Sequence, residues 1–161
     1  MPQRRVPIQV LPGCKGRLPV AELRRVARHV LDAESVAPAV EVEVVLADSE
    51  TVQDLNRLYR GKDEPTDVLS FAAHEGEAFV QSPDETPALG EIVICLPVAE
   101  AQAVAAGRGV AGEVSHLLVH GLLHVLGYDH EDSEGDSQRM QRREDELLNA
   151  LGYAGKYAHG H

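Results

Sequence analysis

The sequence predicts an α+β fold, in which about five helices pack around a small mixed β-sheet. Short apolar segments typical of strands alternate with amphipathic segments typical of helices, and helical segments alone follow residue 96. The chain has 161 residues, of which 43% are hydrophobic, enough for one compact domain with a core. Because no repeat or linker divides the sequence, we expect a single domain over residues 1–155, followed by a flexible tail over residues 156–161.

Four segments are predicted as strands because aliphatic and β-branched residues are concentrated in them. In the segment 40–45, apolar residues alternate with charged ones, as in a strand with one buried face. The segment 89–96 has an apolar centre at residues 92–94 and ends before Pro97, so we expect a buried strand there. The predicted strands span residues 6–10, 40–45, 68–72 and 89–96.

Helical periodicity predicts the helices. From residue 18 to residue 33, apolar residues recur at the spacing of one helix face. A second helix runs through Val52 to Tyr59, and either Asp48 or Ser49 can cap its start. The acidic segment 75–87 contains two prolines and is predicted to be a solvated loop. The remaining helices are predicted over residues 97–107, 110–126 and 134–151.

Composition and charge exclude several classes of protein. No run approaches the roughly 18 uninterrupted apolar residues of a membrane-spanning helix, and no apolar stretch typical of a secretory signal follows Arg4 and Arg5. We therefore expect a cytoplasmic protein with no membrane partner, in which Cys14 and Cys95 are free thiols. The formal charge of −11 repels nucleic acid. A polyanionic substrate would then need a local basic groove, or a partner that supplies positive charge.

Three histidines near residue 125 predict a metal site at the end of a helix. His120 and His124 are four residues apart, about one helical turn, so both side chains project from one face. Gly127 can adopt the left-handed conformation that ends a helix and turns the chain back, which brings His130 within reach of the same ion. Three imidazoles plus a water molecule are the arrangement of a catalytic Zn²⁺, and we expect one such ion per chain.

His116 offers a competing triad with His120 and His124 on the same helix face. Residues 116 and 124 are separated by about 12 Å along a helix, whereas zinc ligands lie about 2 Å from the ion. We therefore leave His116 out of the ligand set, and expect a structural or substrate-facing role for it.

The residue after the first histidine limits which reactions the predicted metal site could catalyse. The spacing of the three histidines is also that of metzincin metallopeptidases, in which a glutamate at this position is the general base. Here the position is Gly121, so a peptidase would lack its base. Cleavage of a phosphodiester tolerates this loss, because the metal polarises a phosphoryl oxygen and the 2′-hydroxyl of RNA is an internal nucleophile. Arg60 could bind the phosphate through two hydrogen bonds and Lys62 could add charge, although basic residues at a helix end also complement the helix dipole.

Three blocks of the sequence resemble the YbeY family of bacterial endoribonucleases. The block HGLLHVLGYDH at residues 120–130 looks like the family pattern H-G-x-L-H-L-x-G-Y-D-H. LNRLYRGKDEPTDVLSF at residues 55–71 and LGEIVIC at residues 89–95 resemble two further family blocks, in the same order. The resemblance covers most of residues 40–150.

This resemblance implies a zinc-dependent endoribonuclease that cuts single-stranded RNA, with no action on DNA. It also implies roles in the 3′-end maturation of 16S rRNA and in the removal of defective ribosomes. His120, His124 and His130 would be the zinc ligands, and Arg60 would contact or stabilise the phosphate. The implied fold has a mixed four-stranded sheet packed with helices.

The chain departs from the family pattern at two positions. Val125 replaces the usual leucine, which is a change within an apolar helix face. Glu91 replaces the common aspartate, at a position that the family links to contact with a small-subunit ribosomal protein. Glutamate keeps the charge and lengthens the side chain. We infer that a ribosomal partner, or a narrow basic cleft near Arg60, offsets the repulsion between the acidic protein and RNA.

Other residues keep more than one interpretation. Asp129 is a candidate base, a candidate to orient a ligand imidazole, or a turn residue that binds its own backbone. Tyr128 and Asp67 are expected to be structural. The absence of an evident base, together with the acidic surface, also leaves open a non-catalytic ribosome assembly factor with a structural zinc. Metzincin-like peptidase activity is the third alternative.

Overall fold

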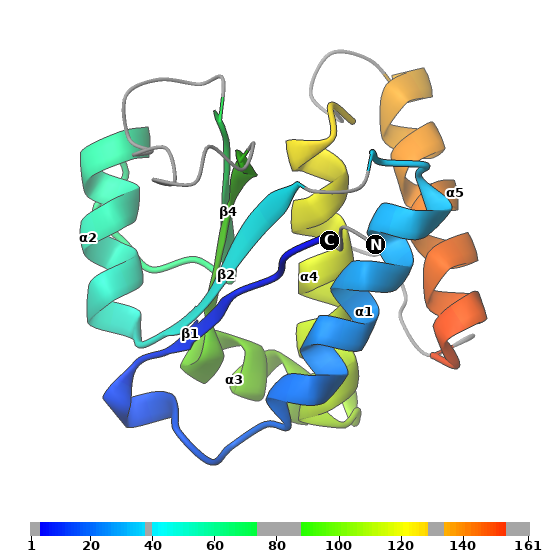
Figure 1. The fold of residues 1–161 in the computed structure, drawn as a ribbon. Helices are drawn as coiled ribbons and strands as arrows, with labels where there is room; N and C mark the ends of the chain where they lie inside the picture. Colours follow the sequence, from blue (N-terminus) through cyan, green and yellow to red (C-terminus); the bar gives the residue numbers. More distant parts are fainter. Residues whose placement is uncertain (1–3, 38–39, 74–87, 129–133, 154–161) are drawn as a thin grey trace.

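The computed structural model describes residues 4–37, 40–73, 88–128 and 134–153 (Figure 1). Two predicted site residues, Asp129 and His130, lie outside these ranges. The predicted loop over residues 75–87 and the predicted tail over 156–161 lie outside them as well. In the part of the chain that is described, no helix is long and apolar enough to cross a membrane.

A four-stranded mixed sheet forms the centre of the molecule. Its strands are β1 (Ile8–Val10), β2 (Glu41–Ala47), β3 (Val68–Ala72) and β4 (Ala88–Cys95), in the order β1-β2-β4-β3. β1, β2 and β4 run parallel, whereas β3 pairs antiparallel with β4 at the edge. The predicted mixed sheet is therefore confirmed.

In the part of the chain that the structure describes, five helices surround the sheet, as predicted, and a short 3₁₀ helix (Pro12–Cys14) follows β1 (Figure 1). Their bounds are within two residues of the predicted ones. Pro97 lies in the first turn of the third helix, where its missing N–H leaves no hydrogen bond unmade. The helices are α1 (Val20–Ala33), α2 (Ser49–Arg60), α3 (Leu96–Ala106), α4 (Val110–Val125) and α5 (Glu134–Leu151).

Side-chain alternation along the strands divides the core between the two faces of the sheet. Val42, Val44 and Leu46 of β2 are buried against a large cluster that includes α1, α4 and α5. Val45 of β2, on the other face, packs in a smaller cluster with Val52 of α2. α4 is buried along most of its length, because helices and the sheet cover it from several sides (Figure 1). α4 is therefore a rigid element on which a site can be built.

The two ends of α2 are set by local interactions. The Asp48 carboxylate accepts a hydrogen bond from the Thr51 amide at 2.7 Å, so Asp48 rather than Ser49 is the cap. At the other end, Gly61 has a φ of 71°, and the amides of Gly61 and Lys62 bond back to the last turn. This left-handed position favours glycine, and it turns the chain sharply after Arg60.

An ion pair on α1 also connects this helix to the end of α5. The Glu22 carboxylate accepts two hydrogen bonds from Arg25, at 2.7 and 2.8 Å, and one from the Tyr153 hydroxyl. Arg25 in turn donates to the Leu151 carbonyl at 3.2 Å. The hydrogen bonds from Arg25 and Tyr153 lower the pKa of Glu22 to about 2.

Glu22→Gln is expected to remove a pH-dependent part of the stability. Because the pKa of Glu22 is lowered in the folded protein, its contribution is present above the unfolded pKa of about 4.5 and is lost as the pH falls toward 2. We expect wild type to exceed the variant by about 1–2 kcal/mol in free energy of unfolding at neutral pH, after allowance for solvent screening. Urea unfolding at neutral pH and near pH 3 measures the difference, which should shrink at the lower pH. A difference that is the same at both values would contradict the prediction.

Candidate active site

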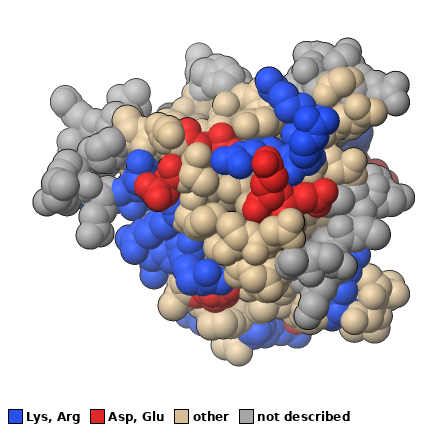
Figure 2. All heavy atoms as spheres, turned by 90° about the vertical axis from the view of Figure 1, so that its right-hand side faces the viewer, with Lys and Arg blue, Asp and Glu red and all other residues tan. Residues whose placement is uncertain are grey.

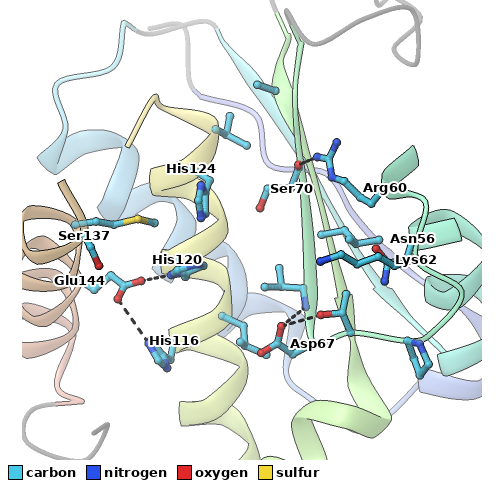
Figure 3. Close-up of a pocket in the computed structure, with 18 of the residues that line it drawn as sticks. Asn56, Arg60, Lys62, Asp67, Ser70, His116, His120, His124, Ser137 and Glu144 are labelled. Carbon is cyan, nitrogen blue, oxygen red and sulfur yellow. Dashed lines mark hydrogen bonds and ion pairs between the residues drawn. The ribbon is translucent and has the colours of Figure 1, made fainter. Parts of the chain in front are cut away.

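A cavity of about 840 Å³ lies between the end of α2, the edge strand β3, and helices α4 and α5 (Figure 3). One wall carries histidines from α4, and the other carries basic and polar residues from α2 and the loop that follows it. The polar residues that line it include Asn56, Arg60, Lys62, Asp67, Ser70, His116, His120, His124, Ser137 and Glu144.

The histidines are placed by the helical repeat of α4. His120 and His124 are one turn apart, and their ring centroids are separated by 4.7 Å. His124 is in the last turn of the helix, which ends at Val125. Gly127 follows with a φ of 106°, so the predicted chain turn is present there. The chain therefore turns just before the segment that carries Asp129 and His130.

Glu144 of α5 joins two of the α4 histidines and was missed by the sequence analysis. Its side chain is only 4% exposed, and one carboxylate oxygen accepts a hydrogen bond from Nδ1 of His120. The other oxygen lies 3.8 Å from Nε2 of His116 (Figure 3). A sequence signal existed, because Glu144 is four residues after Met140 and three before Leu147, on the buried face of α5. A carboxylate on an apolar face needs a partner.

The two histidines keep Glu144 ionised. Burial on its own raises the pKa of this carboxyl group, but the hydrogen bonds from His116 and His120 outweigh burial and bring the pKa to about 2. His116 is itself buried, with 3% of its surface exposed. Its Nε2 lies 3.8 Å from the Glu144 carboxylate, so His116 and His120 contact the same carboxylate group.

The donor set fits a metal ion. A carboxylate at Nδ1 of His120 selects the tautomer in which Nε2 carries the lone pair that binds a metal. His124 presents a second imidazole one turn further along α4. Within residues 4–37, 40–73, 88–128 and 134–153, no group of three His, Cys, Asp or Glu side chains is arranged to hold an ion. A tetrahedral zinc site here needs a ligand from outside these ranges, where His130 lies.

Arg60 is held on the opposite wall by contacts that include the Ser70 carbonyl and the Phe71 ring. Its guanidinium donates a hydrogen bond to the Ser70 carbonyl at 2.8 Å and lies 4.9 Å from the centre of the Phe71 ring. Tyr59 packs edge-on against the same ring. These contacts orient a largely exposed arginine at the rim of the cavity, where Lys62 adds a second positive charge (Figure 3).

The loop after α2 is fixed by hydrogen bonds of two polar side chains, those of Asn56 and Asp67. Asn56, which is 4% exposed, donates to the Glu64 carbonyl at 2.8 Å. Asp67 accepts a hydrogen bond from the Val68 amide at 2.7 Å, which supports the structural role expected for it at this turn. Arg60 therefore ends α2, and Lys62 lies on the loop that follows, whose backbone is constrained at both ends.

Gly121 has a packing role that its sequence position did not suggest. A Cβ atom at this residue would lie 2.9 Å from Ile92 Cγ2 and 3.0 Å from Ser70 Oγ. Glycine thus lets α4 approach the sheet closely. A glutamate here would meet β3 and β4, and its charge would be buried against apolar atoms.

Glu91 does not line this cavity. It lies on β4 directly opposite Glu43 of β2, on the sheet face that also carries Val45 and Val93. Burial raises the pKa of Glu91, and the neighbouring Glu43 raises it further. The structure therefore separates Glu91 from the histidine site.

Comparison with known proteins identifies the family. The family model described as "Endoribonuclease YbeY" matches residues 15–152. The YbeY endoribonuclease of Roseiflexus sp. (strain RS-1) is 44% identical over 151 residues, covering 93% of this chain and 94% of the relative. The protein of the same name from Pelotomaculum thermopropionicum is 46% identical over 129 residues, covering 80% and 84%.

A solved structure shares the fold. The solution structure of TM1509 from Thermotoga maritima superposes with a TM-score of 0.60 at 28% identity, covering 89% of this chain and 88% of that one. The family model alone matches more than half of the chain. The chain therefore belongs to the YbeY family of endoribonucleases, which are hydrolases.

Proposed function

We propose that this protein is a zinc-dependent endoribonuclease that cleaves single-stranded RNA in the cytoplasm, in the 3′-end maturation of 16S rRNA and in ribosome quality control. The observation that carries the proposal is the cavity, which has imidazoles on one wall and a positioned guanidinium on the other. The first can hold a metal and the second can bind a phosphate.

His120, His124 and His130 would hold the Zn²⁺ ion, with water as the fourth ligand. The pairing of His120 with Glu144 and the one-turn spacing to His124 support the first two of these assignments. When bound, the ion supplies Lewis acidity and lowers the pKa of a coordinated water.

Arg60 would bind the scissile phosphate. Its guanidinium is already oriented by the Ser70 carbonyl and the Phe71 ring, so little conformational entropy is lost when a phosphate binds. Lys62 would add a point charge to the same wall. Positive charge that is in place before the reaction stabilises the negative charge that develops on the phosphoryl oxygens.

Asp129 and Glu144 would assist the histidines in different ways. Asp129 precedes His130 and would accept a proton during the reaction, or orient that imidazole. Glu144 would act as a positioning residue, because its carboxylate fixes the ring of His120 and is held in turn by His116.

Glu91 would contact a small-subunit ribosomal protein. Glu91 lies beside Glu43 on the adjacent strand, and the two carboxylates make the local electrostatic potential more negative. This supports a partner with a basic surface. Delivery by such a partner would offset the repulsion between RNA and a chain of net charge −11.

A cleavage assay on the full chain with one equivalent of zinc tests the proposed function. We expect single-stranded RNA to be cut and the same strand in a duplex to remain intact. RNA that stays intact while a peptide is cut would point to a peptidase, which the packing of Gly121 against Ile92 opposes. If neither is cut, and Glu91→Lys impairs rRNA maturation in cells while His124→Ala does not, the protein is an assembly factor.

Arg60→Ala is expected to lower kcat/KM for single-stranded RNA by about 10- to 100-fold, because hydrogen bonds to a charged group contribute about 1.5–3 kcal/mol. Arg60→Lys should recover only part of the activity, since lysine keeps the charge without the two parallel hydrogen bonds. Zinc affinity should not change in either variant. Arg57→Ala, on the same helix and away from the cavity lining, is the matched control. Equal losses at both positions would contradict the role of Arg60.

A further inference from the structure

We propose that a second, basic groove on the outer side of α1 binds the phosphate backbone of an RNA strand, outside the cavity described above. The groove has a volume of about 810 Å³. Seen from the side of α1 and α5, Lys and Arg side chains lie in several areas of the surface, with Asp and Glu side chains between them (Figure 2). The groove is lined by Arg4, Ala21, Arg24, Arg25, Arg28, His29 and Asp32, and we call it the α1 groove.

Charge complementarity identifies the class of ligand. Four arginines line the α1 groove, although the whole chain has only 15 Lys and Arg residues against 26 Asp and Glu. Asp32 is the single acidic residue in the lining. A protein with a net charge of −11 that places four arginines in one concave surface has a local site for polyanions.

Two of the arginines are especially suited to bind phosphates. Arg25 is paired with Glu22, and Arg4 lies 3.5 Å from Asp32, so part of their charge is neutralised. Arg24 and Arg28 form no ion pair with a carboxylate within the described residues. They lie one turn apart on α1, so both side chains project on the same side.

Arg24 is held in place by the fold. Its Nε donates a hydrogen bond to the Val6 carbonyl at 3.2 Å, which orients the guanidinium at the edge of the groove. Arg4 is held in a similar way by the Val36 carbonyl, at 2.9 Å from its Nε. The positive charges are therefore attached to a preformed surface, which lowers the entropy lost on binding.

The polar lining favours RNA over a protein partner. Ala21 is the single aliphatic residue among the seven, whereas specific protein interfaces have an apolar core. Guanidinium groups bind phosphate through paired hydrogen bonds and carry most non-specific affinity for nucleic acid.

The α1 groove would extend the RNA contact made at the cavity. α1 packs against α4, yet no residue of α1 lines the cavity. A short RNA bound in the cavity would not reach the groove, whereas a long strand would occupy both. This inference rests on the proposed function for the identity of the polyanion. Comparing RNAs of different length distinguishes a failure of the α1 groove from a failure of the proposed function.

The test compares the binding of a long and a short single-stranded RNA by fluorescence anisotropy, in a His124→Ala background that prevents cleavage. Replacing both Arg24 and Arg28 by Gln is expected to weaken binding of the long RNA by about 10-fold and to lower the slope of log K against log salt by about 1.4. Binding of the short RNA should change by less than 2-fold. Circular dichroism confirms that the variant is folded.

Matched variants and ligands make the outcomes decisive. Arg28→Lys keeps the charge and should retain most of the affinity, whereas Lys15→Glu alters the net charge at a residue that lines neither cavity and should have little effect. The proposal would be overturned if the variant with both arginines replaced bound the long RNA as tightly as wild type, or if Lys15→Glu weakened that binding equally. It would also be overturned if the double replacement weakened the binding of polyglutamate as much as that of the long RNA. If wild type fails to cut any RNA, the proposed function fails, but groove-dependent binding of the long RNA would still support the α1 groove.

Discussion

Replacing His124 by alanine is expected to lower the affinity for Zn²⁺ by more than about 100-fold and to abolish RNA cleavage. Losing an outer partner of a zinc ligand already costs about 10- to 100-fold in affinity, and loss of a ligand should cost more. The fold should survive, because His124 is at the end of α4 and partly exposed. A local loss of metal, rather than unfolding, would then explain the loss of activity.

Competition with a chromophoric chelator measures this affinity in wild type and variant, and circular dichroism reports the fold. His29→Ala, which removes an imidazole from α1, is the matched control and should keep wild-type zinc affinity. Zinc bound adventitiously by His159 or His161 is common to all variants, so it cancels in the comparison. Wild-type zinc affinity in the His124→Ala protein would remove this residue from the ligand set.

Glu144→Gln is expected to lower zinc affinity by about 10- to 100-fold, although Glu144 touches no metal. Glutamine keeps the size of the side chain but loses the charge that holds the His120 ring in one tautomer. Glu144→Leu should in addition destabilise the fold by about 3 kcal/mol, because one member of a buried charged group is removed while its partners remain.

Zinc titration and urea unfolding separate the two effects of Glu144. ¹⁵N chemical shifts of the His120 ring report its tautomer, and a residue with a purely structural role would not alter them. Glu146→Gln makes the same chemical change two residues away, at an exposed site on α5, and should leave zinc affinity and tautomer unchanged. A Glu144→Gln protein with the wild-type tautomer would exclude the positioning role.

Local patterns in the sequence were sufficient to predict the strands and helices of the fold. β-branched segments and helical periodicity predicted four strands and five helices, because burial of one face imposes a period on the chain whatever packs against it. The same logic placed His120 and His124 together, since their proximity depends only on the helical repeat of α4. The likeness of three blocks to the YbeY family was also readable from the sequence, and the family assignment is confirmed.

Contacts between distant segments required the tertiary structure. Glu144 is 24 residues from His120 in the sequence, and only the packing of α5 against α4 brings them together. Gly121 seemed to be a missing base, yet the approach of α4 to Ile92 explains why no side chain fits there. The α1 groove includes Arg4, which no helical pattern in α1 relates to Arg24 and Arg28.

The sequence by itself therefore determined the secondary structure, the family and the spacing of the histidines, because each depends on residues close together in the chain. The tertiary structure decided which carboxylate orients His120, what holds Arg60 at the rim, and that Glu91 lies apart from the cavity. These depend on the order of strands in the sheet and on which helices meet. Several packings of the same elements satisfy the same local periodicity, so no local pattern specifies them.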